Sequence, residues 1–96
     1  MALMSDRWER VLLRLSELER DASIDLAHGN NDSARARFMQ MVELIRDTCR
    51  PMRDLMVVLK QRGYTAAFPM LDHYAELFRR FTICVRDQLD IMQRSK

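Results

Sequence analysis

The sequence predicts an all-α fold, an antiparallel up-down-up bundle of three long helices that forms a single domain over residues 1–96. Apolar residues make up 48% of the chain, while only two glycines and two prolines are present. So few turn-forming residues argue against a loop-rich or all-β chain. Apolar side chains also recur at three- and four-residue steps through three successive segments, a period typical of helices that bury one face.

The first helix is predicted from about Asp6 to His28. Ser5 can cap its start, and Gly29, which tolerates left-handed backbone, marks its end. The periodic apolar positions are Trp8, Val11 or Leu12, Leu15, Leu18, Ala22 and Leu26. These positions share one side of a helix, so we expect them to face the rest of the bundle.

The second helix is predicted from about Asp32 to Arg62, with Gly63 as its stop. Pro51 lies inside this range, where a proline costs about 3 kcal/mol or more. The apolar row nevertheless keeps its seven-residue spacing through the proline, at Phe38, Ile45, Met52 and Leu59. This favours one helix kinked near Asp47. The alternative is a break at Thr48–Pro51, which would make four helices.

The third helix is predicted from about Pro69 to Arg94, with Thr65 or Phe68 as its cap. A proline fits the first turn of a helix, because its missing N–H has no intrahelical partner there. Two adjacent apolar rows follow, Leu71, Phe78, Val85 and Met92 in one, and Met70, Leu77, Cys84 and Ile91 in the other. A face this wide predicts packing against two helices.

Charge is unevenly distributed along the first helix, although the whole chain carries only +2. The early residues Arg7, Arg10 and Arg14 are basic, whereas Glu17, Glu19, Asp21 and Asp25 are acidic, which opposes the helix dipole. A parallel third helix can compensate, with Asp72 and Glu76 near the early arginines and Arg79, Arg80 and Arg86 near the late carboxylates. The alternative is a two-fold homodimer in which two copies of the first helix pair antiparallel.

No residue pattern predicts an enzyme, a cofactor or a metal site. His73 and Glu76 are three apart on one helical face, but a second such pair is missing. Cys49 and Cys84 fall on predicted apolar faces, where burial makes a thiol inert. Glycine-rich phosphate loops, a serine elbow and CxxC pairs do not occur in the sequence. We therefore expect a non-enzymatic protein.

Surplus apolar residues predict a surface that binds another protein. Beside its main row, the second helix carries Met41, Leu44, Leu55 and Val58, more than one neighbouring helix can cover. Eight methionines fit either core filling or a groove for an amphipathic partner helix. The predicted partner-binding residues are Leu3, Met4, Trp8, Met41, Leu44, Leu55 and Met56.

Arg46, Arg50 and Arg53 form one stripe on the second helix and give an alternative function. A small dimeric regulator could use this stripe to bind nucleic acid, because phosphate contacts need cations on a shared face. Acidic residues are interleaved with the stripe at Glu43, Asp47 and Asp54, which is typical of a solvated helix that pairs its own charges. Protein binding is therefore the main prediction.

The longest apolar runs are far shorter than the roughly 18 residues that span a bilayer. The first residues turn polar at Ser5, unlike a secretory signal. We therefore expect a cytoplasmic protein with no membrane partner. In size and character the chain resembles the small helical adaptors, secretion chaperones and phage- or plasmid-encoded inhibitors of bacterial systems, which implies a protein-binding role without assigning residues.

Overall fold

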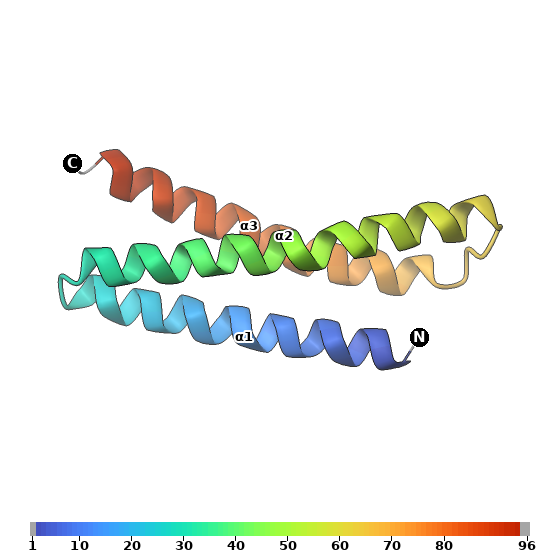
Figure 1. Ribbon diagram of the computed structural model, residues 1–96, viewed down its shortest axis with the longest axis horizontal. Coiled ribbons are helices and arrows are strands. Elements are labelled where there is room, and N and C mark those ends of the chain that lie inside the picture. The colour runs from blue at the N-terminus through green and yellow to red at the C-terminus, as the bar shows by residue number, and fades with distance from the viewer. Residues whose placement is uncertain (1, 95–96) are drawn as a thin grey trace.

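A computed structural model describes residues 2–94, with side chains from residue 6 onward. It contains three helices, α1 (Ala2–Ala27), α2 (Asn31–Gln61) and α3 (Phe68–Arg94) (Figure 1). No strand occurs within residues 2–94. The predicted all-α bundle of three helices is therefore confirmed, and the four-helix alternative is wrong because α2 continues through Pro51.

Glycine ends both of the first two helices, as the sequence predicts. Gly29 and Gly63 have φ angles of 77° and 75°, a left-handed conformation that costs glycine little. Each helix closes with a pair of hydrogen bonds to its last carbonyls, as when the N–H of Asn30 donates to the Asp25 carbonyl at 2.8 Å. The chain reverses direction after each glycine, so α1 and α3 run the same way in Figure 1.

The structure bears on the predicted cap of α1 and on the hydrogen bonding around Pro51. Ser5 is not the cap of α1, because the helix already begins at Ala2. Pro51 leaves the Asp47 carbonyl without its usual N–H partner, but both residues are exposed, so water can satisfy that carbonyl. The kink near Asp47 stays a prediction.

The core runs along α2, which packs over most of its length against both neighbours, whereas α1 and α3 contact each other only slightly. The largest fully buried side chains are Phe38, Phe78, Leu15, Leu18, Met41, Leu71 and Val85. Figure 1 shows the C-terminal part of α3 diverging from the other two helices. The molecule is consequently elongated, 50 × 23 × 17 Å, and grooves remain on both sides of α3.

The acidic end of α1 is compensated by α2, contrary to the expectation that α3 would supply the cations. Arg37 donates to Asp25 at 2.8 Å and to Asp21 at 3.5 Å. The link between α1 and α3 is of another kind, a 2.6 Å hydrogen bond from the Tyr74 hydroxyl to Glu9. The acidic end of α1 is thus matched within the molecule by Arg37.

Candidate helix-binding groove

The structure places two of the predicted partner-binding residues in the core. Trp8 is 3% exposed and Met41 is 0% exposed. Trp8 packs on Tyr74 with 5.3 Å between ring centroids. Neither side chain is available to a partner in this arrangement. Leu3 and Met4 lie outside the residues whose side chains are described.

The remaining predicted residues, Leu44, Leu55 and Met56, are half-buried but lie on two sides of α2. Leu44 and Leu55 share the side of Arg37, which contacts α1, because their spacing corresponds to whole turns of the helix. Leu44 and Leu55 of the second apolar line therefore lie on the side of α2 that faces α1, whereas Val58 of the same line is 42% exposed. Met56 instead lines a cleft between α2 and α3.

Two clefts follow the seam between α2 and α3 and join at Thr82. The first, of about 200 Å³, is lined by Val42, Ile45, Arg46, Thr82, Val85 and Arg86. The second, of about 290 Å³, is lined by Cys49, Met52, Arg53, Met56, Ala75, Arg79 and Thr82. Because Thr82 belongs to both, we treat them as one surface and call it the α2–α3 groove.

The groove forms because α3 contributes small side chains where α2 contributes larger ones. Ala75 and Thr82 are seven residues apart, so they lie on one flank of α3. The Thr82 hydroxyl donates to the Phe78 carbonyl of its own helix at 2.9 Å, so it needs no partner across the groove. Buried Ile45, Met52 and Val85 supply an apolar floor.

Arginines form both walls of the groove in two tiers. Arg46 and Arg86 line the first cleft, and Arg53 and Arg79 line the second. Each tier takes one arginine from α2 and one from α3. The lining side chains of the two clefts, all within residues 6–94, include no carboxylate. The groove therefore combines an apolar floor with positive walls.

These wall arginines have little compensation from the protein itself. Within the described part of the chain, the only ion pair that any of them makes is the 3.9 Å contact of Arg79 with Glu76, in which both side chains are largely exposed. Exposed pairs of this kind contribute little. The positive charge of the groove is thus available to a ligand.

Sequence reasoning placed Arg46 and Arg53 in a nucleic-acid stripe and Met56 in a protein-binding face, whereas the structure brings all three to the same groove. Arg50, the third member of the stripe, is exposed and does not line either cleft. The charge pattern predicts Arg79 and Arg86 near the late carboxylates of α1, but the structure places both in the α2–α3 groove. Their signal is a seven-residue spacing, Arg79 to Arg86, that runs beside the small residues of the same flank.

Cys49 lies in the α2–α3 groove, and Cys84 lies on the other side of α3. Burial raises the pKa of the Cys49 thiol, and the positive charge of Arg53 counteracts part of that rise. Burial also raises the pKa of Cys84, and the negative charges of Glu19 and Asp87 raise it further. Both thiols therefore stay protonated at neutral pH, a state suited to packing more than to nucleophilic attack.

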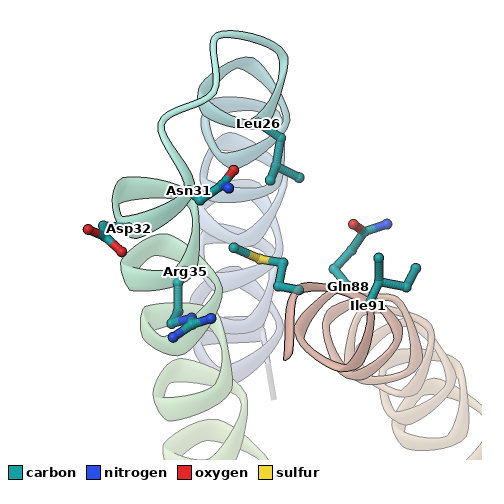
Figure 2. A pocket seen from close by; sticks show the side chains of 7 residues that line it. Leu26, Asn31, Asp32, Arg35, Gln88 and Ile91 are labelled. Atoms are coloured by element: carbon teal, nitrogen blue, oxygen red, sulfur yellow. The ribbon is translucent and has the colours of Figure 1, made fainter. Parts of the chain in front are cut away.

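Two further clefts border α1 and α3. One of about 300 Å³ is lined by Glu19, Leu77, Arg80, Phe81 and Cys84, and we call it the α1–α3 cleft. The other, of about 320 Å³, lies where the C-terminal part of α3 diverges, and is lined by Leu26, Asn31, Asp32, Arg35, Gln88, Ile91 and Met92. In Figure 2, Asp32 points away from the α3 side chains Gln88 and Ile91. The charged side chains of this cleft, Asp32 and Arg35, consequently do not converge on one ligand position.

Among the described residues, no group of three or more His, Cys, Asp or Glu side chains is placed to hold a metal ion. No helix in the described range is both long and apolar enough to cross a membrane. Comparison with other proteins adds no family: no protein-family model matches the sequence, and no curated protein or solved structure is significantly similar to it.

Proposed function

We propose that the protein is a small, non-enzymatic cytoplasmic adaptor, chaperone or inhibitor that binds a helix of another protein in the α2–α3 groove. The observation that carries this proposal is the row of two adjoining clefts with apolar lining residues between two antiparallel helices. It extends from Val42 to Met56, about 21 Å along α2 at 1.5 Å per residue. That length matches a partner helix of about four turns.

The apolar surface around the groove supports such a contact. Val42, Cys49 and Met56 are half-buried, and Met39 and Val57 remain exposed beside them. A docked helix would remove this surface from water, which stabilises a complex by roughly 25 cal/mol per Å². Flexible methionines can adapt to the shape of the partner. Together with α1, α2 and α3, the added helix makes a four-helix arrangement.

Blocking the groove tests this proposal. Thr82→Arg puts a long cationic side chain where the two clefts join, and Ala36→Arg adds the same side chain at an exposed position that lines neither cleft. Affinity capture from the native host with wild type, Thr82→Arg and Ala36→Arg should yield a partner that only Thr82→Arg loses. Circular dichroism must show the same helix content and melting temperature for all three.

If folded Thr82→Arg keeps every captured partner, the groove is not the binding site. A polar substitution at Met56 gives an independent check, because it removes apolar surface without adding bulk. Loss of the same partner from Met56→Gln supports the groove, and retention of all partners at wild-type affinity counts against it.

The nucleic-acid function remains a second proposal, supported by the wall arginines and the lack of carboxylates in the lining. Phosphate contacts release counterions, so binding should weaken steeply between low and moderate salt. Replacing Arg50 and Arg53 by Ala should then abolish retention on a polyanion column, and unchanged retention would dispose of this function. The apolar floor favours a protein helix.

Self-association is a separate proposal that rests on the outer face of α1. Leu13 and Ile24 are 62% and 50% exposed and share that face, since three turns separate them. In an antiparallel pair of α1 helices, the register that sets Leu13 against Ile24 of a second copy also sets Glu17 against its Arg20. Light scattering should show a dimer that Leu13→Arg dissociates. A wild-type monomer at every concentration would contradict it.

A further inference from the structure

We propose that the helix bound in the α2–α3 groove is acidic, with carboxylates on both flanks of its apolar stripe. This inference rests on the proposed function and specifies the chemistry of the partner. It follows from the two tiers of arginines, Arg46 with Arg86 and Arg53 with Arg79, which stand on opposite walls of one apolar channel.

The spacing of the tiers defines what the partner must carry. The two arginines on each wall are seven residues apart in the sequence, about 10.5 Å along a helix. A helix that lies along the groove places carboxylates opposite both arginines of a wall when its own carboxylates are seven residues apart on that flank. Thr82 lies between the tiers, where the recess accepts an apolar side chain from the middle of the partner stripe.

The electrostatics of the groove favour carboxylates over other groups. The acidic residues of α2 all lie outside the lining, at Asp32, Glu43, Asp47 and Asp54. The wall arginines at the edge of the apolar floor attract carboxylates on the flanks of a docked helix, because complementary charges across an interface steer and orient the partner. The guanidinium group also matches a carboxylate with two parallel hydrogen bonds.

The apolar floor decides between a protein helix and a nucleic acid. Duplex DNA offers phosphates but no apolar stripe, so it would leave the half-buried Val42, Cys49 and Met56 of the lining facing water or sugar. An acidic amphipathic helix can cover the apolar floor with its apolar stripe and pair its carboxylates with the wall arginines. We therefore argue for the helix and treat DNA binding as an outcome of the test.

The experiment compares two synthetic helical peptides of about four turns that share one Leu and Met stripe. One carries Glu on both flanks at seven-residue intervals, and the other carries Lys at the same positions. Fluorescence anisotropy at low salt gives the affinity of the full chain for each. Four exposed ion pairs, each worth a few tenths of a kcal/mol, predict about a tenfold preference for the Glu peptide.

Two double variants test whether the wall arginines cause the preference for the Glu peptide. Arg46→Gln with Arg53→Gln should reduce the preference about threefold, since half of the wall charge is removed. Arg7→Gln with Arg10→Gln is the matched control, because it removes the same net charge from exposed positions on α1. Protection of Cys49 from alkylation, with Cys84 unprotected, reports that the peptide occupies this groove.

The outcomes separate this inference from the function on which it rests. If both peptides bind equally, protect Cys49 and are blocked by Thr82→Arg, the helix-binding groove stands and the acidic partner is overturned. If neither peptide binds at millimolar concentration, both are overturned. Tight binding of duplex DNA that Arg53→Gln weakens and Thr82→Arg leaves unchanged also overturns the acidic helix, in favour of a phosphate-binding surface.

Discussion

Helix α3 borders a recess on each side, and the two differ in size of side chain and in charge. Toward α2, the small side chains Ala75 and Thr82 leave the α2–α3 groove open between its arginine walls. Toward α1, the larger Leu77 and Phe81 line the α1–α3 cleft, whose charged lining residues have opposite signs, Glu19 and Arg80. The two flanks of α3 therefore border recesses of different charge, a positive α2–α3 groove and a neutral α1–α3 cleft.

The seam between α1 and α3 also carries polar links that the α2–α3 groove lacks. Tyr74 donates to Glu9 at 2.6 Å and packs against Trp8. Arg80, at the edge of this seam, and Arg79, in the α2–α3 groove, lie 3.8 Å and 3.9 Å from the same exposed Glu76, so this contact does not distinguish the two sides. The difference lies in the lining: Glu19 lines the α1–α3 cleft together with Arg80, whereas the lining of the α2–α3 groove contains four arginines and no carboxylate. A recess is thus common to both sides of α3, and uncompensated charge in the lining is particular to the α2–α3 groove.

The largest expected effect comes from removing a large core side chain of α3. Phe78 is 1% exposed and lies on the buried row of α3, so Phe78→Ala should lower the free energy of unfolding by about 3–5 kcal/mol through lost burial and a cavity. Urea unfolding followed by circular dichroism measures this. Ile83→Ala, at a half-exposed position, is the control and should cost about 0.5 kcal/mol or less. Equal costs for both would show that Phe78 is not a shared core residue.

The next effect concerns the ion pair that links α2 to α1. Arg37→Gln removes the 2.8 Å bond to Asp25, whose side chain is only 15% exposed. We expect a loss of about 1–2 kcal/mol, reduced from a fully buried pair because Arg37 is partly exposed. The control is Arg20→Gln, since Arg20 makes only a 3.9 Å contact with Asp21. The interpretation fails if the two variants unfold at the same urea concentration.

A smaller effect tests the polar link of the α1–α3 seam. Tyr74→Phe keeps the ring and removes the hydroxyl that bonds Glu9, so we expect a loss of about 0.5–1.5 kcal/mol. Hydrogen exchange should rise near the N-terminal half of α1 and leave the α2–α3 pairing unchanged. Tyr64→Phe, in the exposed connection between α2 and α3, should have no measurable effect. Faster exchange along the α2–α3 seam would contradict this assignment.

The smallest effect is a change in the alkylation rate of Cys49 in the α2–α3 groove, with Cys84 in the α1–α3 cleft as the control. Arg53 lowers the pKa of Cys49 against the opposing effect of burial, so Arg53→Gln should raise that pKa further. A raised pKa leaves less thiolate at a given pH, and alkylation of Cys49 should slow across mildly alkaline pH. Cys84, which faces Glu19 and Asp87, should keep its pH profile. An unchanged rate at Cys49 would mean that Arg53 does not lie close to the groove floor.

Much of the fold follows from local chemistry in the sequence. Gly29 and Gly63 end helices because their backbone is left-handed, and the seven-residue row from Phe38 to Leu59 crosses Pro51 without a change of phase. The start of α1 was misjudged because Ser5 is compatible with a cap or with a helix interior. Such choices depend on side chains beyond the local pattern.

The site was only half predictable, for a topological reason. Periodicity shows that Arg46, Arg53 and Met56 lie near one edge of the apolar face of α2. It does not show whether α3 packs against that edge or the opposite one, because this depends on the handedness of the bundle. Arg79 and Arg86 could therefore not be assigned to the same groove from sequence, and Met41 could not be assigned to the α1 side.

The most direct measurement is an NMR titration of the methionine methyl groups with the Glu-flanked helical peptide. Met52 and Met56 line the α2–α3 groove, whereas Met92 lines the cleft at the far end of α3. If the peptide occupies the α2–α3 groove, the Met52 and Met56 signals shift until the protein is saturated while the Met92 signal stays in place. Shifts at Met92 with no change at Met52 and Met56 would contradict binding in this groove.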